Sequence, residues 1–394
     1  MLEALRCHPS ISSVVPIDAS FRGLWDALVA DSVKFSESRW LVNYSHGRFA
    51  IRARSRLLRQ QLRRQCSEFD IVLLIGGRYE PFPVPYAMFI DTTVDLTAAG
   101  WSPWAPGRND QLWSIGADKE QLRAATQVFT AGRYVAEHLV RDYGIAPDRV
   151  TPIGCGISYP MASIPARTQS PKPTILFVGH DFERQGGDVL VEAFTRVRSA
   201  IPDAQLLLVG AAHLPESATG ITLLGEVDDR HQLSDLYRTA TVFCLPARFE
   251  PYGLAVLEAM AHGVPCVATR VGAMSEILHD GQLGLLVDPE DVQGLADTLT
   301  SLLHDRRLQD TLSQRARRAV EGQKTWDAVA DRLGLREEED LNAGTLAVLV
   351  PTSVQRRHDQ APRYLSIPKI DRRLSFAECR SQGSACRAVR AGCR

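Results

Sequence analysis

The chain lacks the features that mark membrane-spanning, zinc-binding and polyanion-binding proteins. Its 394 residues contain no run of 18 apolar residues, which argues against a transmembrane helix. No signal-peptide pattern opens the sequence, so we expect a cytoplasmic protein. No cysteine pair has zinc-ligand spacing to histidines, and the formal net charge of −1 argues against a polyanion partner for the chain as a whole.

The chain also has few lysines and no Asp-x-Asp triplet. Only five lysines occur, and none has the context of a pyridoxal-binding lysine, which disfavours an enzyme that depends on pyridoxal. Asp-x-Asp is absent from the whole chain, so we expect no metal site of that type. The eight cysteines are scattered, and Cys155, Cys244 and Cys266 fall in or beside apolar segments. We expect these three to be buried free thiols.

The length and the alternation of apolar strands with helical patterns predict two α/β domains. About 150 residues make a typical domain, so 394 residues suggest two domains and some excess. Alternating strands and helices indicate parallel sheets with crossover helices, which bind ligands at the carboxyl ends of their strands. The predicted strands are 13–17, 71–75, 87–90, 127–129, 150–153, 174–178, 205–209, 241–245, 264–268 and 284–287. The predicted helices are 48–65, 132–143, 187–199, 232–239, 253–262, 291–304, 307–321 and 325–334.

Changes in composition divide the chain into four parts. Residues 1–155 form the first domain, and residues 156–172, rich in Pro, Ser and Ala, form a linker without periodicity. Residues 173–338 form the second domain. Residues 339–394 follow no core pattern, and from residue 341 they carry ten cations against three anions, a net charge of +7. We expect this arginine-rich tail to be disordered, although such a tail could also bind nucleic acid or anionic lipid.

The most informative stretch is 249–260, which reads FEPYGLAVLEAM. It follows a short buried strand and places Glu250 on a turn and Glu258 roughly a turn and a half into the next helix. The backbone amides of 252–254 lie at the helix N-terminus, which favours an anion such as a phosphate. Two carboxylates around a phosphate-binding turn suit a ligand with phosphates in its middle and hydroxyls at both ends. A nucleotide-sugar is such a ligand.

Further stretches accompany this motif in a fixed order. ILFVG at 175–179 precedes DFERQGG at 181–187, and GVPCVAT at 263–269 precedes GLLV at 284–287. With the Glu-x7-Glu spacing, they resemble the retaining glycosyltransferases of family 4 over residues 65–335. The resemblance implies the GT-B fold: two Rossmann-like, doubly wound parallel-sheet domains with an interdomain cleft. It also implies that the second domain binds the nucleotide-sugar and the first lies on the acceptor side.

The resemblance assigns roles to the residues of the motif. Glu250 would be the catalytic carboxylate at the donor sugar, Glu258 would bind the ribose hydroxyls, and Arg184 would neutralise the diphosphate. Two alternatives stay open: Glu250 could only complement the helix dipole, and Glu258 could be an exposed helix glutamate. The remaining expected donor-binding residues are Gly179, His180, Gln185, Tyr252, Gly253 and Leu254.

Some positions depart from the family pattern. Gln185 stands where relatives usually have lysine, and losing a charged contact could cost about 1.5–3 kcal/mol. His180 stands where many relatives have arginine. The stretch 272–276 lies where relatives often have Gly-Gly-x-Pro-Glu; Gly272 can still allow a close backbone approach, and Glu276 has either a donor-site or a helix-orienting role.

Candidates on the acceptor side come from the ends of predicted strands. Gly76 and Gly77 follow one strand, and Asp91 follows another where the family often has a histidine. Asp91 either stands in for that histidine or only forms a turn. Trp101 and Trp104 would either form an apolar wall for the acceptor or pack in the core.

The beginning of the chain also differs from the family. Residues 1–5 resemble the helix that follows the family's first strand, so we expect this strand to be missing. The alternative is a divergent but complete domain. The basic amphipathic segment 48–65 either lies on the inner face of an anionic membrane as a peripheral contact or is a solvated surface helix.

These features together predict a retaining, metal-independent glycosyltransferase without a cofactor. It would move a hexose from a nucleotide diphosphate sugar to a hydroxyl acceptor on a glycan or a lipid-linked saccharide, and no nucleic-acid partner is expected. The alternative is a catalytically inactive GT-B relative that binds nucleotide-sugar or a partner protein. Gln185, the absent first strand and the unusual tail favour that alternative.

Overall fold

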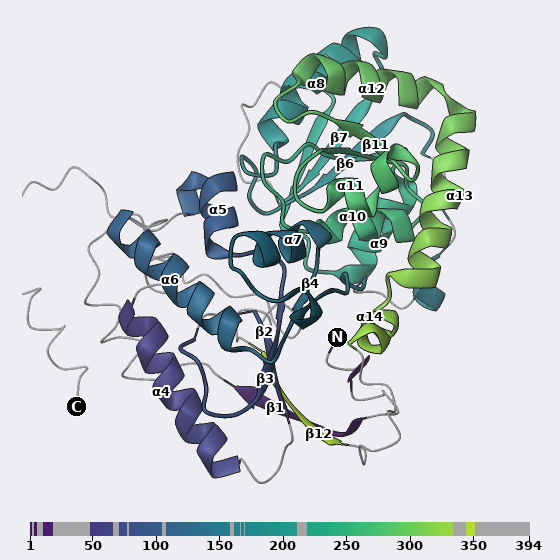
Figure 1. The fold of residues 1–394 in the computed structure, drawn as a ribbon. Helices are drawn as coiled ribbons and strands as arrows, with labels where there is room; N and C mark the ends of the chain where they lie inside the picture. The colour runs from purple at the N-terminus through teal and green to yellow at the C-terminus, as the bar shows by residue number, and fades with distance from the viewer. Residues whose placement is uncertain are drawn as a thin grey trace, which may run out of the picture. The chain divides into compact units, whose positions relative to one another are not determined.

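A computed structural model shows two parallel sheets connected and covered by helices (Figure 1). It describes residues 1, 4–5, 11–18, 48–65, 71–76, 79–104, 108–157, 161–165, 167–168, 170–210, 219–333 and 344–350. Residues 1–355 form one compact unit. Each sheet of the described part has six strands, and the pairings between them are parallel. The predicted α/β class with two Rossmann-like sheets is therefore confirmed.

The first sheet has the strand order β1-β12-β2-β3-β4-β5. Its strands are β1 (Ile11–Asp18), β12 (Gly344–Val350), β2 (Ile71–Ile75), β3 (Tyr86–Ile90), β4 (Gln127–Thr130) and β5 (Val150–Pro152). Its helices are α4 (Arg48–Gln65), α5 (Val94–Gly100), α6 (Arg108–Ala124) and α7 (Arg133–Arg141). All five residues of β3 are buried. Such continuous apolar strands are typical of parallel sheets that are covered on both faces.

The residues of the first sheet alternate between two hydrophobic clusters. Val72 and Met88 belong to a cluster with residues of α4, α6 and α7. Leu73 and Phe89 belong to a larger cluster that includes Phe177 of the second sheet. This alternation follows from the period of two in a strand. Apolar packing therefore continues from the first sheet into the second part of the chain.

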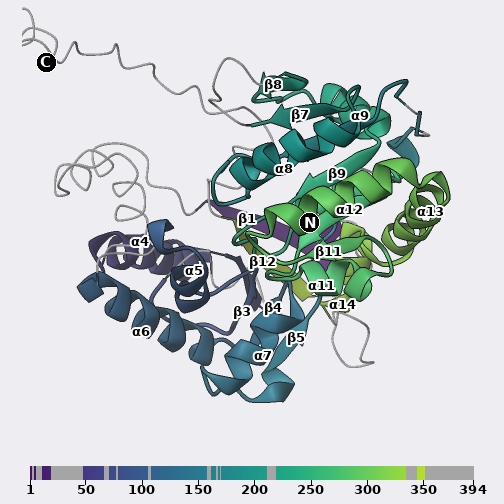
Figure 2. The ribbon, with the colours of Figure 1, turned by 90° about the horizontal axis from the view of Figure 1, so that it is seen from above.

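The second sheet has the order β11-β10-β9-β6-β7-β8. Its strands are β6 (Thr174–Val178), β7 (Gln205–Val209), β8 (Ile221–Gly225), β9 (Val242–Leu245), β10 (Cys266–Thr269) and β11 (Leu285–Val287). Its helices are α8 (Gly187–Ala200), α9 (Arg230–Thr239), α10 (Leu254–Ala261), α11 (Met274–Ile277), α12 (Val292–His304), α13 (Arg306–Gln323) and α14 (Trp326–Arg332). Helices α8 and α12 pack side by side (Figure 2). Short 3₁₀ segments lie at Ser102–Trp104, Pro147–Arg149, Met161–Ser163 and His279–Gly281.

The predicted strands all exist, with ends within two residues of the observed ones. Strands β8 and β12 and helices α5, α6 and α11 were not predicted from the sequence. Cys155, Cys244 and Cys266 are buried free thiols, as predicted. Burial raises the pKa of each of these thiols. None of the helices in the described ranges is long and apolar enough to span a membrane.

Strand β12 corrects one expectation about the end of the chain. Residues 339–394 were expected to be disordered, yet Gly344–Val350 pairs with β1 on one side and β2 on the other. The net charge of +7 misled that prediction, because every cation counted lies beyond residue 355, whereas β12 reads GTLAVLV. The expectation that the first strand of the family is missing stays a prediction. The rest of the predicted tail lies outside the described residues.

Candidate active site

The second sheet places Glu250 on the turn between β9 and α10. Gly253 ends this turn with a φ of 99°, and a side-chain Cβ at this residue would lie 2.1 Å from the Met274 Cε. Gly272 lets the neighbouring loop approach the same turn, because a Cβ on it would lie 1.9 Å from the Glu250 carbonyl oxygen. Helix α10 therefore begins at Leu254, one residue after its predicted start, and its N-terminal amides favour an anion.

The Glu250 carboxylate is held by the loop that follows β6. Its Oε2 lies 3.2 Å from the Arg184 Nη1 and accepts a hydrogen bond from the Gln185 Nε2 at 3.1 Å. The Arg184 Nη1 also donates to the Phe249 carbonyl at 2.7 Å, and its Nε lies 3.3 Å from the Asp181 Oδ2. The predicted residues 184, 185 and 250 are therefore brought together.

Gln185 connects the two ends of this loop to the carboxylate. Its Oε1 accepts from the Asp181 amide at 3.1 Å, while its Nε2 donates to Glu250. A lysine could make the second contact but could not accept the first. Gln185 thus fixes the loop in a way that the usual lysine cannot, at the cost of one positive charge.

The ion pair at this site is largely removed from solvent. The side chain of Arg184 is 10% exposed and that of Glu250 is 14% exposed. Arg184 faces two carboxylates, those of Asp181 and Glu250. Low exposure strengthens the interaction of these charges with one another and with any charge that develops nearby.

Glu258 lies one turn along α10 from its first residues and is half-buried. Its Oε2 accepts a hydrogen bond from the Tyr237 hydroxyl at 3.2 Å. Tyr237 is fully buried, and its ring stacks on His262 with centroids 5.1 Å apart. This support makes Glu258 an oriented carboxylate rather than the exposed helix glutamate that the sequence left as an alternative.

Contacts from the first sheet reach the turn that holds Glu250. The Tyr134 hydroxyl, from α7, donates to the Pro251 carbonyl at 3.0 Å. The Arg133 amide, at the first residue of α7, donates to the Glu276 Oε2 at 2.7 Å. Glu276 therefore orients a helix. That helix is α7 of the first sheet, not α11, in which Glu276 lies.

Asp91 lies at the carboxyl end of β3, where its charge interacts with that of Glu250. Loss of solvation raises the pKa of Asp91, and the Glu250 carboxylate raises it further. Asp91 itself is exposed to solvent. The charge of Glu250, from the second sheet, thus makes the carboxyl group of Asp91 more inclined to hold a proton.

The other predicted residues differ in their burial and in whether the structure describes them. Gly179 is buried at the end of β6 and His180 beside it is exposed. Tyr252 has a buried side chain, so it and the exposed Leu254 offer mainly their backbone amides. Gly76 follows β2 with a φ of 63°. Gly77 and the side chain of Trp104 lie outside the described residues, and Trp101 is partly exposed.

Helix α4 carries the basic segment 48–65. Its apolar residues Ile51, Leu58 and Leu62 are buried in the protein, so that face is not available to a membrane. Arg59 and Arg52 form ion pairs with Glu80. These contacts fit the solvated surface helix that the sequence left as an alternative.

Asp181, Tyr134 and Tyr237 contact the site residues and were not predicted. Asp181 opens the loop that the sequence did identify, so its position alone was a signal. Tyr134 and Tyr237 reach the site from α7 and α9, and no local pattern connects them with it. Among the described residues, no group of three or more His, Cys, Asp and Glu side chains is arranged to hold a metal.

Comparisons with known proteins agree with this geometry. Residues 172–305, which contain Arg184, Glu250 and Glu258, match the family described as glycosyl transferases group 1. The structure resembles sucrose-phosphate synthase from Thermosynechococcus elongatus, with a TM-score of 0.58 and 21% identity, over 73% of this chain and 78% of that one. The fold is GT-B. An Anabaena protein solved with UDP-glucose, at 15% identity and a TM-score of 0.54, has the same fold over 70% of this chain and 80% of its own.

This GT-B chain also has curated relatives. It is 36% identical over 169 residues to phosphatidyl-myo-inositol mannosyltransferase from Mycobacterium leprae, which covers 41% of this chain and 45% of the relative. The chain spans about half the length of the curated relatives that it first matches. The aligned identity therefore supports one part of the molecule and leaves its whole activity to be proposed.

Proposed function

We propose that the protein is a retaining glycosyltransferase that moves a hexose from a nucleoside diphosphate sugar to a hydroxyl of a glycan or a lipid-linked saccharide. One observation carries the proposal: the Glu250 carboxylate is held by Arg184 and Gln185 beside the N-terminus of α10. The match of residues 172–305 to the glycosyl transferases group 1 supports it. The reaction would take place in the cytoplasm.

Each part of the donor has a partner in this proposal. The diphosphate lies at the N-terminal amides of α10 and near Arg184, where partial and full positive charges meet. The ribose hydroxyls donate to Glu258, which Tyr237 holds in place. The sugar lies beside Glu250, whose negative charge stabilises the positive charge that develops at the anomeric carbon.

The reaction balances without a cofactor. The bond between the anomeric carbon and the phosphate oxygen breaks, and the bond to the acceptor oxygen forms on the same face of the sugar. The acceptor proton passes to the departing phosphate, which leaves as the nucleoside diphosphate. Arg184 stabilises the charge on that leaving group.

Asp91 occupies the acceptor side. It follows β3 on the first sheet, and its carboxyl group interacts with the charge of Glu250, so we place the acceptor hydroxyl beside Asp91. A carboxyl group with a raised pKa can donate as well as accept a hydrogen bond to such a hydroxyl. Asp91 would therefore orient the acceptor rather than remove its proton.

A binding-only relative is the competing function, and one observation favours it. Arg184 already faces the carboxylates of Asp181 and Glu250, and Gln185 adds no charge to the loop. The site thus offers less uncompensated positive charge to a diphosphate than an Arg and Lys pair would.

Release of nucleoside diphosphate from UDP- and GDP-hexoses, measured in EDTA, tests the proposal. We expect slow hydrolysis of one donor by the protein and a rate at background for Glu250→Gln. Binding of a nucleoside diphosphate without turnover of any donor would establish the binding-only relative instead. Turnover that requires an added metal would refute the metal-independent mechanism.

A further inference from the structure

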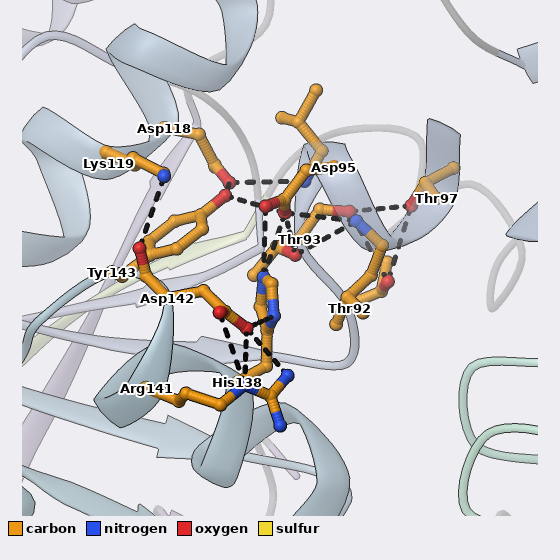
Figure 3. Close-up of polar contacts among 12 residues, drawn as sticks. Thr92, Thr93, Asp95, Thr97, Asp118, Lys119, His138, Arg141, Asp142 and Tyr143 are labelled. Atoms are coloured by element: carbon orange, nitrogen blue, oxygen red, sulfur yellow. Dashed lines mark hydrogen bonds and ion pairs between the residues drawn. The ribbon is translucent and has the colours of Figure 1, made fainter. Parts of the chain in front are cut away.

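A network of polar side chains, buried or half-buried except for the exposed Asp142, lies behind the β3–α5 turn in the first domain (Figure 3). Its members are Thr93 and Asp95 at the start of α5, Asp118 on α6, His138 on α7, and Asp142 and Tyr143 directly after α7. The donor site does not contain any of them. The proposed mechanism therefore leaves a costly cluster of polar groups without a role.

His138 sits between two carboxylates, as Figure 3 shows. Its Nε2 lies 3.0 and 3.1 Å from the two carboxylate oxygens of Asp95, and its Nδ1 lies 2.7 Å from the Asp142 Oδ2. Each of these contacts is an ion pair when the ring carries both of its protons. The ring is nearly buried, and it joins α7 to α5.

Tyr143 adds a second connection between helices. Its hydroxyl lies 2.9 Å from the Asp95 Oδ1 and 2.9 Å from the Asp118 Oδ2, so a single proton serves both carboxylates. Burial raises the pKa of Tyr143, which keeps that proton in place. Burial alone would raise the pKa of Asp95, but hydrogen bonds from Thr93, Tyr143 and His138 outweigh it and lower that pKa.

The network ends on the backbone next to Asp91. The Asp118 Oδ2 accepts from the Val94 amide at 3.2 Å, and the Asp95 Oδ1 accepts from the Thr93 hydroxyl at 2.6 Å. Thr93 in turn caps α5 by accepting from the Leu96 amide. The turn that carries Asp91 is thus fixed by side chains from α6 and α7.

We propose that His138 and Tyr143 are positioning residues that hold the β3–α5 turn, and with it Asp91, against the donor site. The inference rests on the proposed glycosyl transfer for its effect on rate. Neither residue contacts the donor in this scheme. They act only through the position of Asp91.

A network of this kind could also serve stability alone, so the test needs a matched control. Tyr143→Phe removes only the hydroxyl. Tyr86→Phe does the same at the opposite, amino-terminal end of β3, where the buried Tyr86 hydroxyl donates to the Gln121 carbonyl at 2.7 Å. Both tyrosines belong to the same hydrophobic cluster, and only Tyr143 touches the turn.

The first measurement is hydrogen–deuterium exchange of peptides that span residues 91–97. We expect about tenfold faster exchange there in Tyr143→Phe than in the wild type, and no change in Tyr86→Phe. His138→Gln, which keeps a donor at only one end, should show the same local effect. Equal exchange in the Tyr143 and Tyr86 variants would overturn the inference.

The second measurement is donor hydrolysis with the nucleotide-sugar that the wild type turns over. We expect kcat to fall about tenfold in Tyr143→Phe, because small misplacements of reacting groups are costly, while the Kd of the nucleoside diphosphate stays unchanged. A fall shared with Tyr86→Phe would show a structural role only and contradict the inference. If the wild type turns over no donor, the proposed function fails, and the exchange result still decides whether the network positions the turn.

Discussion

The two sheets of this protein are assembled from the chain in different ways. The second sheet takes all six strands from one stretch, residues 174–287. The first sheet takes five strands from residues 11–152 and its remaining strand, β12, from residues 344–350, beyond the whole second sheet. The second sheet is therefore continuous in sequence, whereas the first sheet needs a strand from residues 344–350.

The polar clusters of the two domains also differ in what they do. Behind the first sheet, Asp95, His138 and Tyr143 satisfy one another and hold a turn. At the second sheet, Arg184 and Glu250 meet at a helix N-terminus that still favours an anion. In the proposed function, the second domain binds the donor and the first domain sets the geometry around it.

The largest expected effect comes from removing β12. A chain that ends after residue 343 should lose the cooperative unfolding of its first domain, a cost of more than about 4 kcal/mol, because a strand inside the sheet loses its pairing on both sides. The second domain should still unfold cooperatively. Calorimetry and limited proteolysis measure both, and a chain that ends after residue 355 is the control. Identical melting of the two truncations would show that β12 contributes nothing.

The next largest effect concerns the second domain alone. Glu250→Gln keeps the shape of the side chain but removes its charge, so kcat for donor hydrolysis should fall about 10²-fold or more. Binding of the nucleoside diphosphate should barely change, since that ligand lacks the sugar. Glu183→Gln, an exposed carboxylate in the same loop as Arg184, is the control and should keep its rate. Equal loss in both variants would remove Glu250 from its role.

Glu258→Gln should have a smaller effect of a different kind. It weakens a contact to the ribose that exists already in the ground state, so the affinity for the nucleoside diphosphate should fall about tenfold, with less change in kcat. Calorimetric titration and steady-state kinetics separate the two quantities. Lost turnover with intact nucleotide binding would place Glu258 at the reacting centre.

The smallest expected effect is on the stability of the first domain in acid. The pKa of Asp95 is lowered in the folded protein below its unfolded value of about 3.9. Its stabilising contribution is therefore complete above that value and is lost as the pH falls through the folded pKa. Urea unfolding between pH 7 and pH 3 should show this loss, and Asp95→Asn should flatten it. An unchanged acid limb in Asp95→Asn would mean that other carboxylates cause the loss.

How much the sequence predicts depends on whether a feature is local. The turn with Glu250, the loop with Arg184 and Gln185, and the strands of the second sheet other than β8 were predicted because each is encoded within a few neighbouring residues. Strand β12 was missed because its partners lie at the other end of the chain. Its apolar run was also read together with the charged tail that follows it.

The network around His138 was missed for a related reason. His138 lies between Asp95 and Asp142, and Asp95 is 43 residues away in sequence, so no local spacing indicates a site there. Asp181 was within reach of the sequence, because it opens a loop that was already identified. The contact of Glu276 with the amide of Arg133 was not, since it joins two domains.

The position of β12 also determines when the first domain can fold during synthesis. Domains usually fold in the order in which they leave the ribosome, at about 5–20 residues per second. Here the second sheet has emerged in full before residues 344–350 are synthesised, so it folds first. Until then, β1 and β2 have unpaired edges on the sides where β12 will pair. Exposed edges of this kind invite pairing with other chains. A nascent chain of this protein should therefore depend on chaperones until β12 is made, although the second domain is already folded.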